Sequence, residues 1–477
     1  MATSIPIRHL SFWLIVFCNF CQAEPTVDEV KAAIKQSATF FAEKVSKHGG
    51  YVYYYSTDLE KRLGEGVAEA DQIWVQPPGT PTVGMAFLEA YQATRDPFYL
   101  QVAINAAEAL VYGQLQSGAW TNAIDFNPRG SRVSQYRNGK GKGRNFSTLD
   151  DDISQSAIQF LAKLDRETGF QNRSIHEAVE LALNALLGAQ FPNGALPQGW
   201  DETSASANQS ADKKANYPEY DWRTEGRIKE YWDAYTLNDG VAETVVDTLL
   251  TAYEVYQKEE YNDALRRLGD FLILAQMPSP QPAWAQQYNY EMQPIWARKF
   301  EPPAIAARES EGVIISLMKI AMHFKDKKYL EPIPAALKYL EASELPGGVL
   351  PRYLELKTNE PLYMERDGKA YKLTNSDARL PSHYGWKNPS NVTHLKTAWQ
   401  SIQSRKGLPS PVVPEGPMPT VPEVISSLDS EGRWVSEYSG EALVGQPKFA
   451  SGEAYINSAV FSRNMGILSQ YLIKMTQ

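Results

Sequence analysis

The sequence predicts an all-α protein whose helical hairpins pack into an α/α toroid, an incomplete α/α barrel with long loops that form a cleft. One observation is an internal repeat: two helix-like stretches and a loop with Gly-Ala-Trp or a related sequence recur every 65 to 90 residues, roughly. The other is the apolar pattern, as in Val245, Leu249, Ala252 and Tyr256, at three- and four-residue spacing. Hairpins with their long loops at one end favour a toroid; an open solenoid that binds protein is the alternative.

The repeat units follow one another along the chain. The first helices of the complete units are predicted to begin at Thr82, Asp150, Asp239 and Ser310. The second helices are predicted at 99–115, 175–190, 261–276 and 329–340, and the closing loops at 118–120, 194–197, 283–284 and 347–350. Partial units lie at both ends, with an early helix that closes at 49–51 and a last helix at 454–474.

Residues 1–23 have the pattern of a signal peptide. Arg8 and His9 precede the apolar run 10–17, and Ala23 is a small residue at the cleavage point. The apolar run is too short for a permanent membrane anchor. Both cysteines lie in this segment, so the mature chain has no disulfide. We therefore expect a secreted protein, either periplasmic or extracellular.

After the signal peptide, the repeat continues to the end of the sequence, which predicts one toroid domain over residues 24–477. Small polar residues at 202–214 predict a mobile excursion, and prolines at 408–422 predict an extended connector. Because the repeat continues on both sides of each segment, neither is a domain boundary.

Charge and aromatic content narrow the class of ligand. The net charge is −9, and the absence of a basic run argues against nucleic acid as a partner. The 26 Tyr and 11 Trp favour stacking on sugar rings, although helical cores also use these residues. An acidic chain binds an acidic polymer only where Arg, Lys or metal ions are concentrated, so an anionic ligand requires such a site.

Acidic residues open the second and third units. Asp150, Asp151 and Asp152 precede one predicted helix, and Asn238 with Asp239 precedes the next. One interpretation of each group is a helix N-cap. Three successive aspartates exceed what a cap needs, so a hard divalent cation bound through oxygen ligands is the second interpretation.

The segments around these residues resemble, in order, the motifs of the pectic acid lyase family, the family-10 polysaccharide lyases. The resemblance extends over residues 148–386, about half of the chain. The matching segments are Thr-Leu-Asp-Asp (148–151), Gln-Phe-Pro-Asn-Gly (190–194) with Pro-Gln (197–198), Tyr-Thr-Leu-Asn-Asp (235–239), Ala-Trp (283–284) with Gln287, Ala-Arg-Lys-Phe-Glu (297–301) with Glu309 and Ser310, Arg-Tyr-Leu-Glu (352–355) and Arg-Asp-Gly (366–368).

The resemblance implies an α/α toroid that cleaves polygalacturonate by β-elimination, with calcium (Ca²⁺) at the scissile sugar. It implies that Arg298 abstracts the C5 proton and that Asp150 and Asp239 bind calcium. The residues implied to bind substrate are Asp151, Asn238, Trp284, Glu301, Arg352 and Arg366. We expect a monomer without a membrane anchor.

The implied chemistry is physically consistent, with one difficulty. The C5 proton is acidic only when the charge of the adjacent carboxylate is neutralised, which a cation or Arg can do, and Arg binds carboxylates through two hydrogen bonds. Arg is an awkward base because its pKa is normally above about 12. In the alternative, Arg298 only neutralises charge and Tyr288 takes the proton.

The sequence departs from the family pattern near the predicted site. Gly240 replaces an aspartate, Tyr288-Asn289 replaces His-Asp, and Asp152 adds a negative charge. The alternatives are a lyase of another uronate polymer, a glycoside hydrolase with Asp150 and Asp239 as the acid–base pair, or an inactive polysaccharide-binding relative. A hydrolase leaves the arginines without a role, and the presence of Arg298 opposes an inactive relative, which Gly240 favours.

Overall fold

The computed structural model describes residues 24–201, 213–224, 231–368, 370–410, 412–413 and 416–476. The predicted signal peptide and most of the predicted excursion at 202–214 lie outside these residues. Among the described helices, none is both long and apolar enough to cross a membrane.

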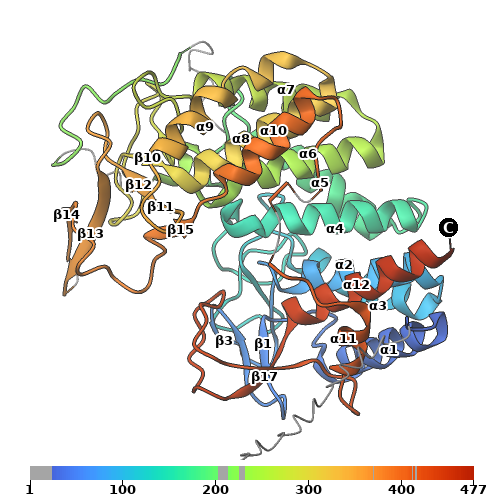
Figure 1. The fold of residues 1–477 in the computed structure, drawn as a ribbon. Coiled ribbons are helices and arrows are strands. Elements are labelled where there is room, and N and C mark those ends of the chain that lie inside the picture. The colour runs from blue at the N-terminus through green and yellow to red at the C-terminus, as the bar shows by residue number, and fades with distance from the viewer. Residues whose placement is uncertain are drawn as a thin grey trace, which may run out of the picture.

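The helices form an α/α toroid of an inner and an outer layer. The inner helices pack side by side in the order α12 (Ser458–Thr476), α2 (Thr80–Thr94), α4 (Ile153–Glu167), α6 (Val241–Tyr256), α8 (Ala307–Phe324) and α10 (Val392–Gln403). The outer helices α1 (Val27–Phe40), α3 (Pro97–Gly113), α5 (Arg173–Ala189), α7 (Glu259–Leu274) and α9 (Ile333–Ala342) pack on α12, α2, α4, α6 and α8. The toroid is incomplete, and α10 and α12 lie on opposite sides of α4 in Figure 1.

Short turns join the inner helices α2, α4, α6 and α8 to their outer partners. The helices α2, α6 and α8 end on left-handed residues, Arg95, Gln257 and Lys325, with φ between 53° and 59°. Asp96 then caps α3 by accepting a hydrogen bond from the N–H of Phe98. Because these turns all lie at one end of the helices, the long loops gather at the other end.

The tryptophans of the repeated loops are structural. Trp120 and Trp284 are fully buried, and their indole N–H groups donate to the carbonyls of Leu110 and Leu272 in the outer helices, each at 2.8 Å. Trp434 makes the same contact with Val424 in the short helix α11 (Val421–Ser426). These loops therefore hold neighbouring helices together, and their buried tryptophans are not available to stack on a sugar ring.

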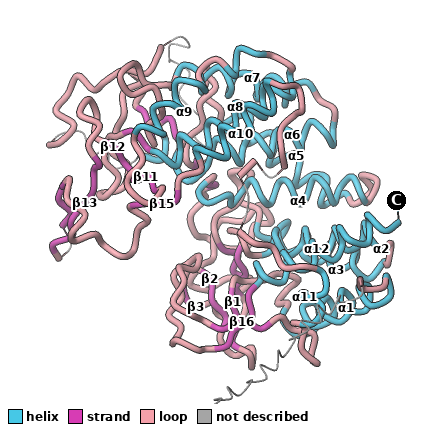
Figure 2. The backbone as a smooth tube through the Cα atoms, viewed as in Figure 1, coloured by secondary structure: helices cyan, strands magenta, loops and turns pink. Residues whose placement is uncertain are grey.

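Short antiparallel strands occupy the loop end, on the left in Figure 2. The two-stranded ladders are β4 (Gln72–Trp74) with β5 (Ala123–Asp125), β6 (Ser147–Thr148) with β7 (Gly199–Trp200), β8 (Tyr235–Thr236) with β9 (Gln287–Tyr288) and β11 (Val349–Pro351) with β15 (Lys387–Pro389). A four-stranded sheet contains, in spatial order, β10 (Ile305–Ala306), β12 (Tyr353–Leu354), β13 (Pro361–Asp367) and β14 (Ala370–Thr374). A five-stranded sheet contains, in spatial order, β16 (Val435–Glu437), β17 (Ala454–Asn457), β1 (Tyr54–Ser56), β2 (Arg62–Gly64) and β3 (Gly66–Val67). An inner helix begins soon after β4, β6, β8, β10 and β17.

One hydrophobic core extends from Val30 to Leu472 between the two helical layers. A second, smaller core lies under β10, β12 and β13 and includes Trp296, Tyr353 and Trp386. The second core supports the segment that carries one wall of the site.

Candidate active site

Two turns of closely similar structure carry the acidic residues. The first acidic turn (residues 150–152) follows β6 and Leu149, and the second acidic turn (residues 238–240) follows β8 and Leu237. In each, the middle aspartate has a left-handed backbone, with φ 45° at Asp151 and φ 52° at Asp239. The inner helix begins directly afterwards, so neither turn is an ordinary N-cap, and neither has a side-chain capping bond.

The two turns bring three carboxylates together. Oxygen atoms of Asp150, Asp151 and Asp239 all lie within 4.8 Å of one another. The amide nitrogen of Gln198 joins the turns, donating to Asp150 Oδ1 at 3.0 Å and to Asp239 Oδ2 at 3.2 Å. Asn238 Nδ2 donates to Asp239 Oδ2 at 2.5 Å. The amides of Gln198 and Asn238 therefore orient these carboxylates without neutralising their negative charge.

Ionisation of the carboxyl groups in and beside the acidic cluster is unfavourable. Displacement of water by the surrounding protein, and then repulsion from Asp150 and Glu65, raise the pKa of Asp151 to about 6. Burial, and then contact with Asp150, raise the pKa of Asp239 well above its ordinary value. Burial, with Asp247 and Glu243 nearby, raises the pKa of Asp152 to about 7. A bound divalent cation would remove this repulsion.

Arg298 lies between the second acidic turn and Glu301. Its Nη2 is 3.3 Å from Asp239 Oδ2 and 2.7 Å from Glu301 Oε1, and its Nε donates to Glu301 Oε2 at 2.9 Å. Burial alone would lower the pKa of Arg298, but Glu301 and Asp239 outweigh it and raise that pKa. Glu301 is buried and also accepts from Tyr384, so it positions Arg298 and does not face a ligand.

A second arginine enters the same cavity from β11–β12. Arg352 Nη2 donates to Glu309 Oε1 at 3.2 Å, and its guanidinium lies 4.4 Å from the centre of the Tyr384 ring. Burial lowers the pKa of Arg352, but Glu309 outweighs this effect and keeps the group protonated. Arg352 is therefore a fixed positive charge beside an aromatic face.

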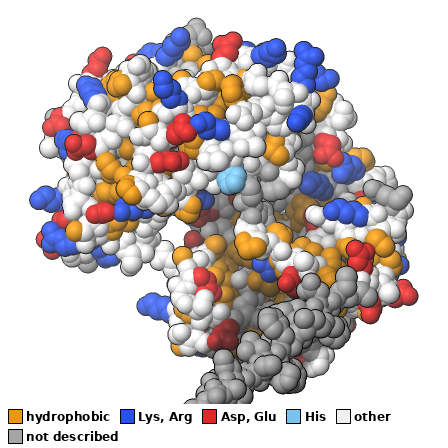
Figure 3. All heavy atoms as spheres, viewed as in Figure 1, with side chains coloured by type: hydrophobic (Ala, Val, Ile, Leu, Met, Phe, Trp, Pro, Cys, Tyr) orange, Lys and Arg blue, Asp and Glu red, His pale blue; other side chains and the backbone are white. Residues whose placement is uncertain are grey.

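These groups line one cavity of about 930 Å³, which includes Asp151, Asp239, Arg298 and Arg352. Its walls also contain Phe300 of the matched segment 297–301 and residues outside the matched segments: Glu65, Gln76, Arg308, His383, Tyr384 and residues 443–446. Gln446 Nε2 donates to the His383 carbonyl at 3.2 Å and links two of these walls. On the face drawn in Figure 3, acidic and basic side chains are interspersed. The positive charge for an anionic ligand is thus supplied by arginines inside the cavity.

The family model for pectic acid lyases matches residues 114–392, a segment that holds both acidic turns, Arg298 and Arg352. The chain belongs to the pectic acid lyase family. It is a polysaccharide lyase. No curated protein matches the sequence of this lyase.

Solved structures with a similar arrangement include a family 10 polysaccharide lyase from Cellvibrio cellulosa, which is 19% identical and aligns over 66% of this chain and 95% of its own with a TM-score of 0.47. A mutant of that lyase in complex with trigalacturonic acid is 18% identical, over 68% and 98% of the two chains, with a TM-score of 0.46. The cellobiose 2-epimerase from Bacillus thermoamylovorans B4167 is 13% identical, over 94% and 99%, with a TM-score of 0.47.

Some residues predicted for this lyase do not reach the cavity. The prediction that Trp284 binds substrate is wrong, because its ring is fully buried. The alternative in which Tyr288 is the base is also wrong, because its buried hydroxyl donates to the Ala275 carbonyl and burial raises its pKa. Arg366 is exposed on β13, where it donates to the Gly368 carbonyl, and it does not line the cavity. Asn238 is buried and orients Asp239.

Gly240 is a departure from the family pattern that lines the cavity of this lyase, as Asp152 also does. It has φ 71° and takes the place in the second acidic turn that Asp152 takes in the first. A Cβ at Gly240 would meet no atom within 4 Å. The second turn therefore contributes one carboxylate and leaves open space beside it.

Proposed function

We propose that the protein cleaves polygalacturonate, the de-esterified form of pectin, by calcium-assisted β-elimination. The observation that carries the proposal is the pairing, within one cavity, of a three-carboxylate cluster with Arg298 and Arg352. Carboxylates alone would repel a uronate, and arginines alone would leave the acidic cluster without a partner. A uronate polymer together with a hard cation satisfies both groups.

The donor set fits calcium. Asp150, Asp151 and Asp239 supply carboxylate oxygens, and buried oxygens of Asn238 and Gln198 have no hydrogen-bond partner. All are the hard oxygen ligands that calcium prefers. When bound there, calcium would supply positive charge to the uronate carboxylate and make the adjacent C5 proton more acidic.

Arg352 and Arg298 have separate roles in the proposed reaction. Arg352, held by Glu309 and Tyr384, binds a uronate carboxylate through its fork of N–H donors. In its neutral, deprotonated form Arg298 takes the proton from C5; the electrons of that C–H bond form the C4–C5 double bond, and the C4–O bond breaks, with the leaving oxygen taking a proton from water. Because Glu301 and Asp239 raise the pKa of Arg298, we expect the rate to rise into the alkaline range.

The test is an assay with polygalacturonate, with calcium and with a chelator, in which unsaturated product is followed by its ultraviolet absorbance and new reducing ends are counted. Absorbance should rise with calcium and stop in Arg298→Ala, whereas Arg173→Ala, an exposed arginine on α5, should behave as wild type. Reducing ends without absorbance would indicate a hydrolase instead. Binding without either product would indicate an inactive relative.

We also infer that residues 24–477 act as one exported, monomeric catalytic unit. The signal-peptide pattern of residues 1–23 supports export. A core that extends from Val30 to Leu472 supports one unit.

A further inference from the structure

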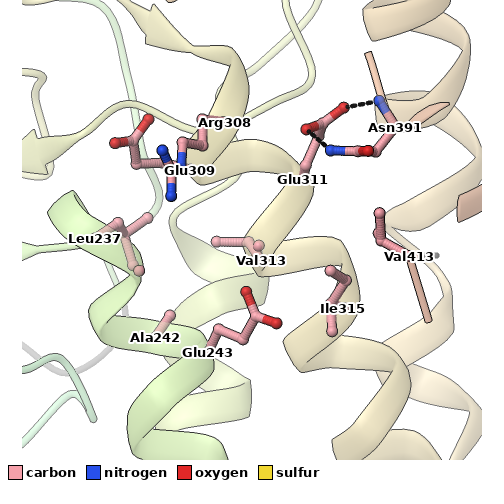
Figure 4. A pocket seen from close by; sticks show the side chains of 12 residues that line it. Leu237, Ala242, Glu243, Arg308, Glu309, Glu311, Val313, Ile315, Asn391 and Val413 are labelled. Atoms are coloured by element: carbon pink, nitrogen blue, oxygen red, sulfur yellow. Dashed lines mark hydrogen bonds between the residues drawn. The ribbon is translucent and has the colours of Figure 1, made fainter. Parts of the chain in front are cut away.

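A second, smaller cavity lies beside the proposed catalytic cavity. It has a volume of about 250 Å³ and shares Gly240, Glu243 and Arg308 with the larger cavity. Figure 4 shows this second cavity, with Arg308 and Glu309 on one side and Glu243 on the other. The proposed reaction uses none of these shared side chains.

Arg308 differs from the other cavity arginines in having no carboxylate in direct contact, although at longer range its charge partly offsets the burial that raises the pKa of Asp151, Glu243 and Glu311. Arg298 and Arg352 each contact a buried glutamate, whereas Arg308 makes no hydrogen bond or ion pair with any residue that the structure describes. Arg308 is an exposed residue in the first turn of α8. Its fork of N–H donors is therefore available to a ligand.

The repeat explains why Arg308 faces the cavity. In the second and third units, the N–H of Leu149 and of Leu237 donates to the carbonyl of Gln198 and of Gln286, and the next residue begins an acidic turn. In the fourth unit, the N–H of Ala307 donates to the carbonyl of Arg352 in the same way, at 3.0 Å, and the next residue is Arg308. Arg308 thus has the position that Asp150 and Asn238 have in the earlier units.

The remaining lining suits one sugar ring. Apolar side chains, among them Leu237, Val313 and Ile315, can cover the C–H face of a pyranose. Among the described residues, the Glu243 carboxylate accepts no hydrogen bond and has a long ion pair, at 3.9 Å, with Lys319, so it can accept from sugar hydroxyls. Glu311 is already engaged, because it accepts from the backbone and side chain of Asn391 (Figure 4).

We propose that the second cavity is an additional subsite for one uronate unit of the same polymer, with Arg308 binding the carboxylate and Glu243 binding a ring hydroxyl. The inference rests on the proposed polyuronate substrate and deepens it. A neutral sugar would leave Arg308 unpaired, so the subsite selects an acidic unit. The cavity is smaller than the 300–1,000 Å³, roughly, of sites that enclose larger ligands, which fits a single ring.

The experiment is a calorimetric measurement of affinity for galacturonate oligomers from dimer to hexamer, made with calcium present in an Arg298→Ala background that keeps substrate intact. Without further changes, affinity should increase stepwise with length. Adding Arg308→Ala should remove one step, a loss of about tenfold, which is about 1.4 kcal/mol. Arg308→Lys should retain part of the step, and Arg173→Ala, another exposed arginine in the first turn of a helix, should retain all of it.

The inference is overturned if the Arg308→Ala curve superimposes on its parent at every length, or if affinity falls equally for all lengths including the dimer. Glu243→Gln provides a second variant of the same cavity and should weaken the same step, while thermal unfolding checks that each variant is folded. Wild-type turnover separates the two proposals. If Arg308→Ala removes the step but wild type forms no unsaturated product, the subsite is supported and the lyase reaction is rejected. If the affinity curves superimpose but wild type forms unsaturated product, the lyase reaction is supported and the subsite is rejected.

Discussion

The first and second acidic turns have the same backbone and different chemistry. Both follow a two-residue strand and a Thr-Leu pair, both contain a left-handed aspartate, and both lead into an inner helix. The first turn has three consecutive aspartates and makes no ion pair among the described residues. The second has Asn238, Asp239 and Gly240, and Asp239 is paired with Arg298.

The difference shows how two copies of one structural repeat can have separate roles in the proposed reaction. The first turn concentrates negative charge, which suits metal binding, and the second turn connects that charge to the arginine proposed to act on substrate. Gln198 ties the two together by donating to a carboxylate of each. One ion shared by both turns is the simplest account of their close approach.

The largest expected effect is at Asp239, because it serves both turns. Asp239→Asn removes a proposed calcium ligand and the partner of Arg298, so we expect kcat/KM to fall by about 10²- to 10³-fold, and added calcium should not restore it. The measurement is steady-state β-elimination on polygalacturonate. Asp263→Asn, an exposed aspartate on α7, is the matched control and should be unaffected. Near-normal activity in Asp239→Asn would contradict the proposal that Asp239 connects the metal site to Arg298.

Asp150 in the first turn should behave differently. Asp150→Asn weakens the metal site without touching Arg298, so calcium affinity should fall by about 10- to 100-fold and raised calcium should restore kcat. Activity is measured as a function of calcium concentration. If calcium rescued Asp239→Asn as well as Asp150→Asn, the proposed division of roles between the turns would be wrong.

The first turn should also make the metal-free protein sensitive to pH. In the folded state the pKa of Asp151 is about 6 and that of Asp152 about 7, both above the ordinary value of 3.8. The folded state therefore binds protons more tightly, so its free energy of unfolding should decrease as pH rises from about 4 to about 7. Denaturant unfolding with a chelator measures this slope, which Asp152→Asn should reduce. A rising free energy over this range would contradict the assignment.

The smallest effect should come from making the turns more alike. Gly240→Asp restores the carboxylate that the family pattern has, into open space and at a φ of 71° that Asp tolerates. We expect calcium affinity to increase by less than about tenfold, offset in part by backbone strain. Gly169→Asp, at φ 65° beyond the far end of α4, is the control and should leave affinity unchanged. Weaker calcium binding in Gly240→Asp would show that this space belongs to substrate.

Much of the fold could be predicted because helix periodicity is a strong local signal. The predicted helices 99–115, 175–190 and 261–276 correspond within two residues to α3, α5 and α7. The longer strands β13 and β14 were not predicted, and most of the strands could not be predicted, because strands of two to four residues are too short for a periodic pattern. For the same reason the predicted last helix began at 454, where residues 454–457 pair as β17.

The site was predictable where charge and motif coincided. The structure brings the predicted Asp150, Asp151, Asp239, Arg298 and Arg352 together. Trp284 was misassigned because a buried indole that fastens a loop and an exposed one that stacks on sugar look the same in a sequence. Tyr384 and residues 443–446 were not indicated, because only tertiary packing brings them to the cavity.

The most direct test of the central claim, that both turns hold one calcium ion, is a calorimetric titration of calcium into wild type, Asp150→Asn and Asp239→Asn at neutral pH. The shared site predicts one ion per chain in wild type and a markedly weakened site in each single variant. Two ions per chain, or a variant that keeps the full wild-type affinity, would contradict it.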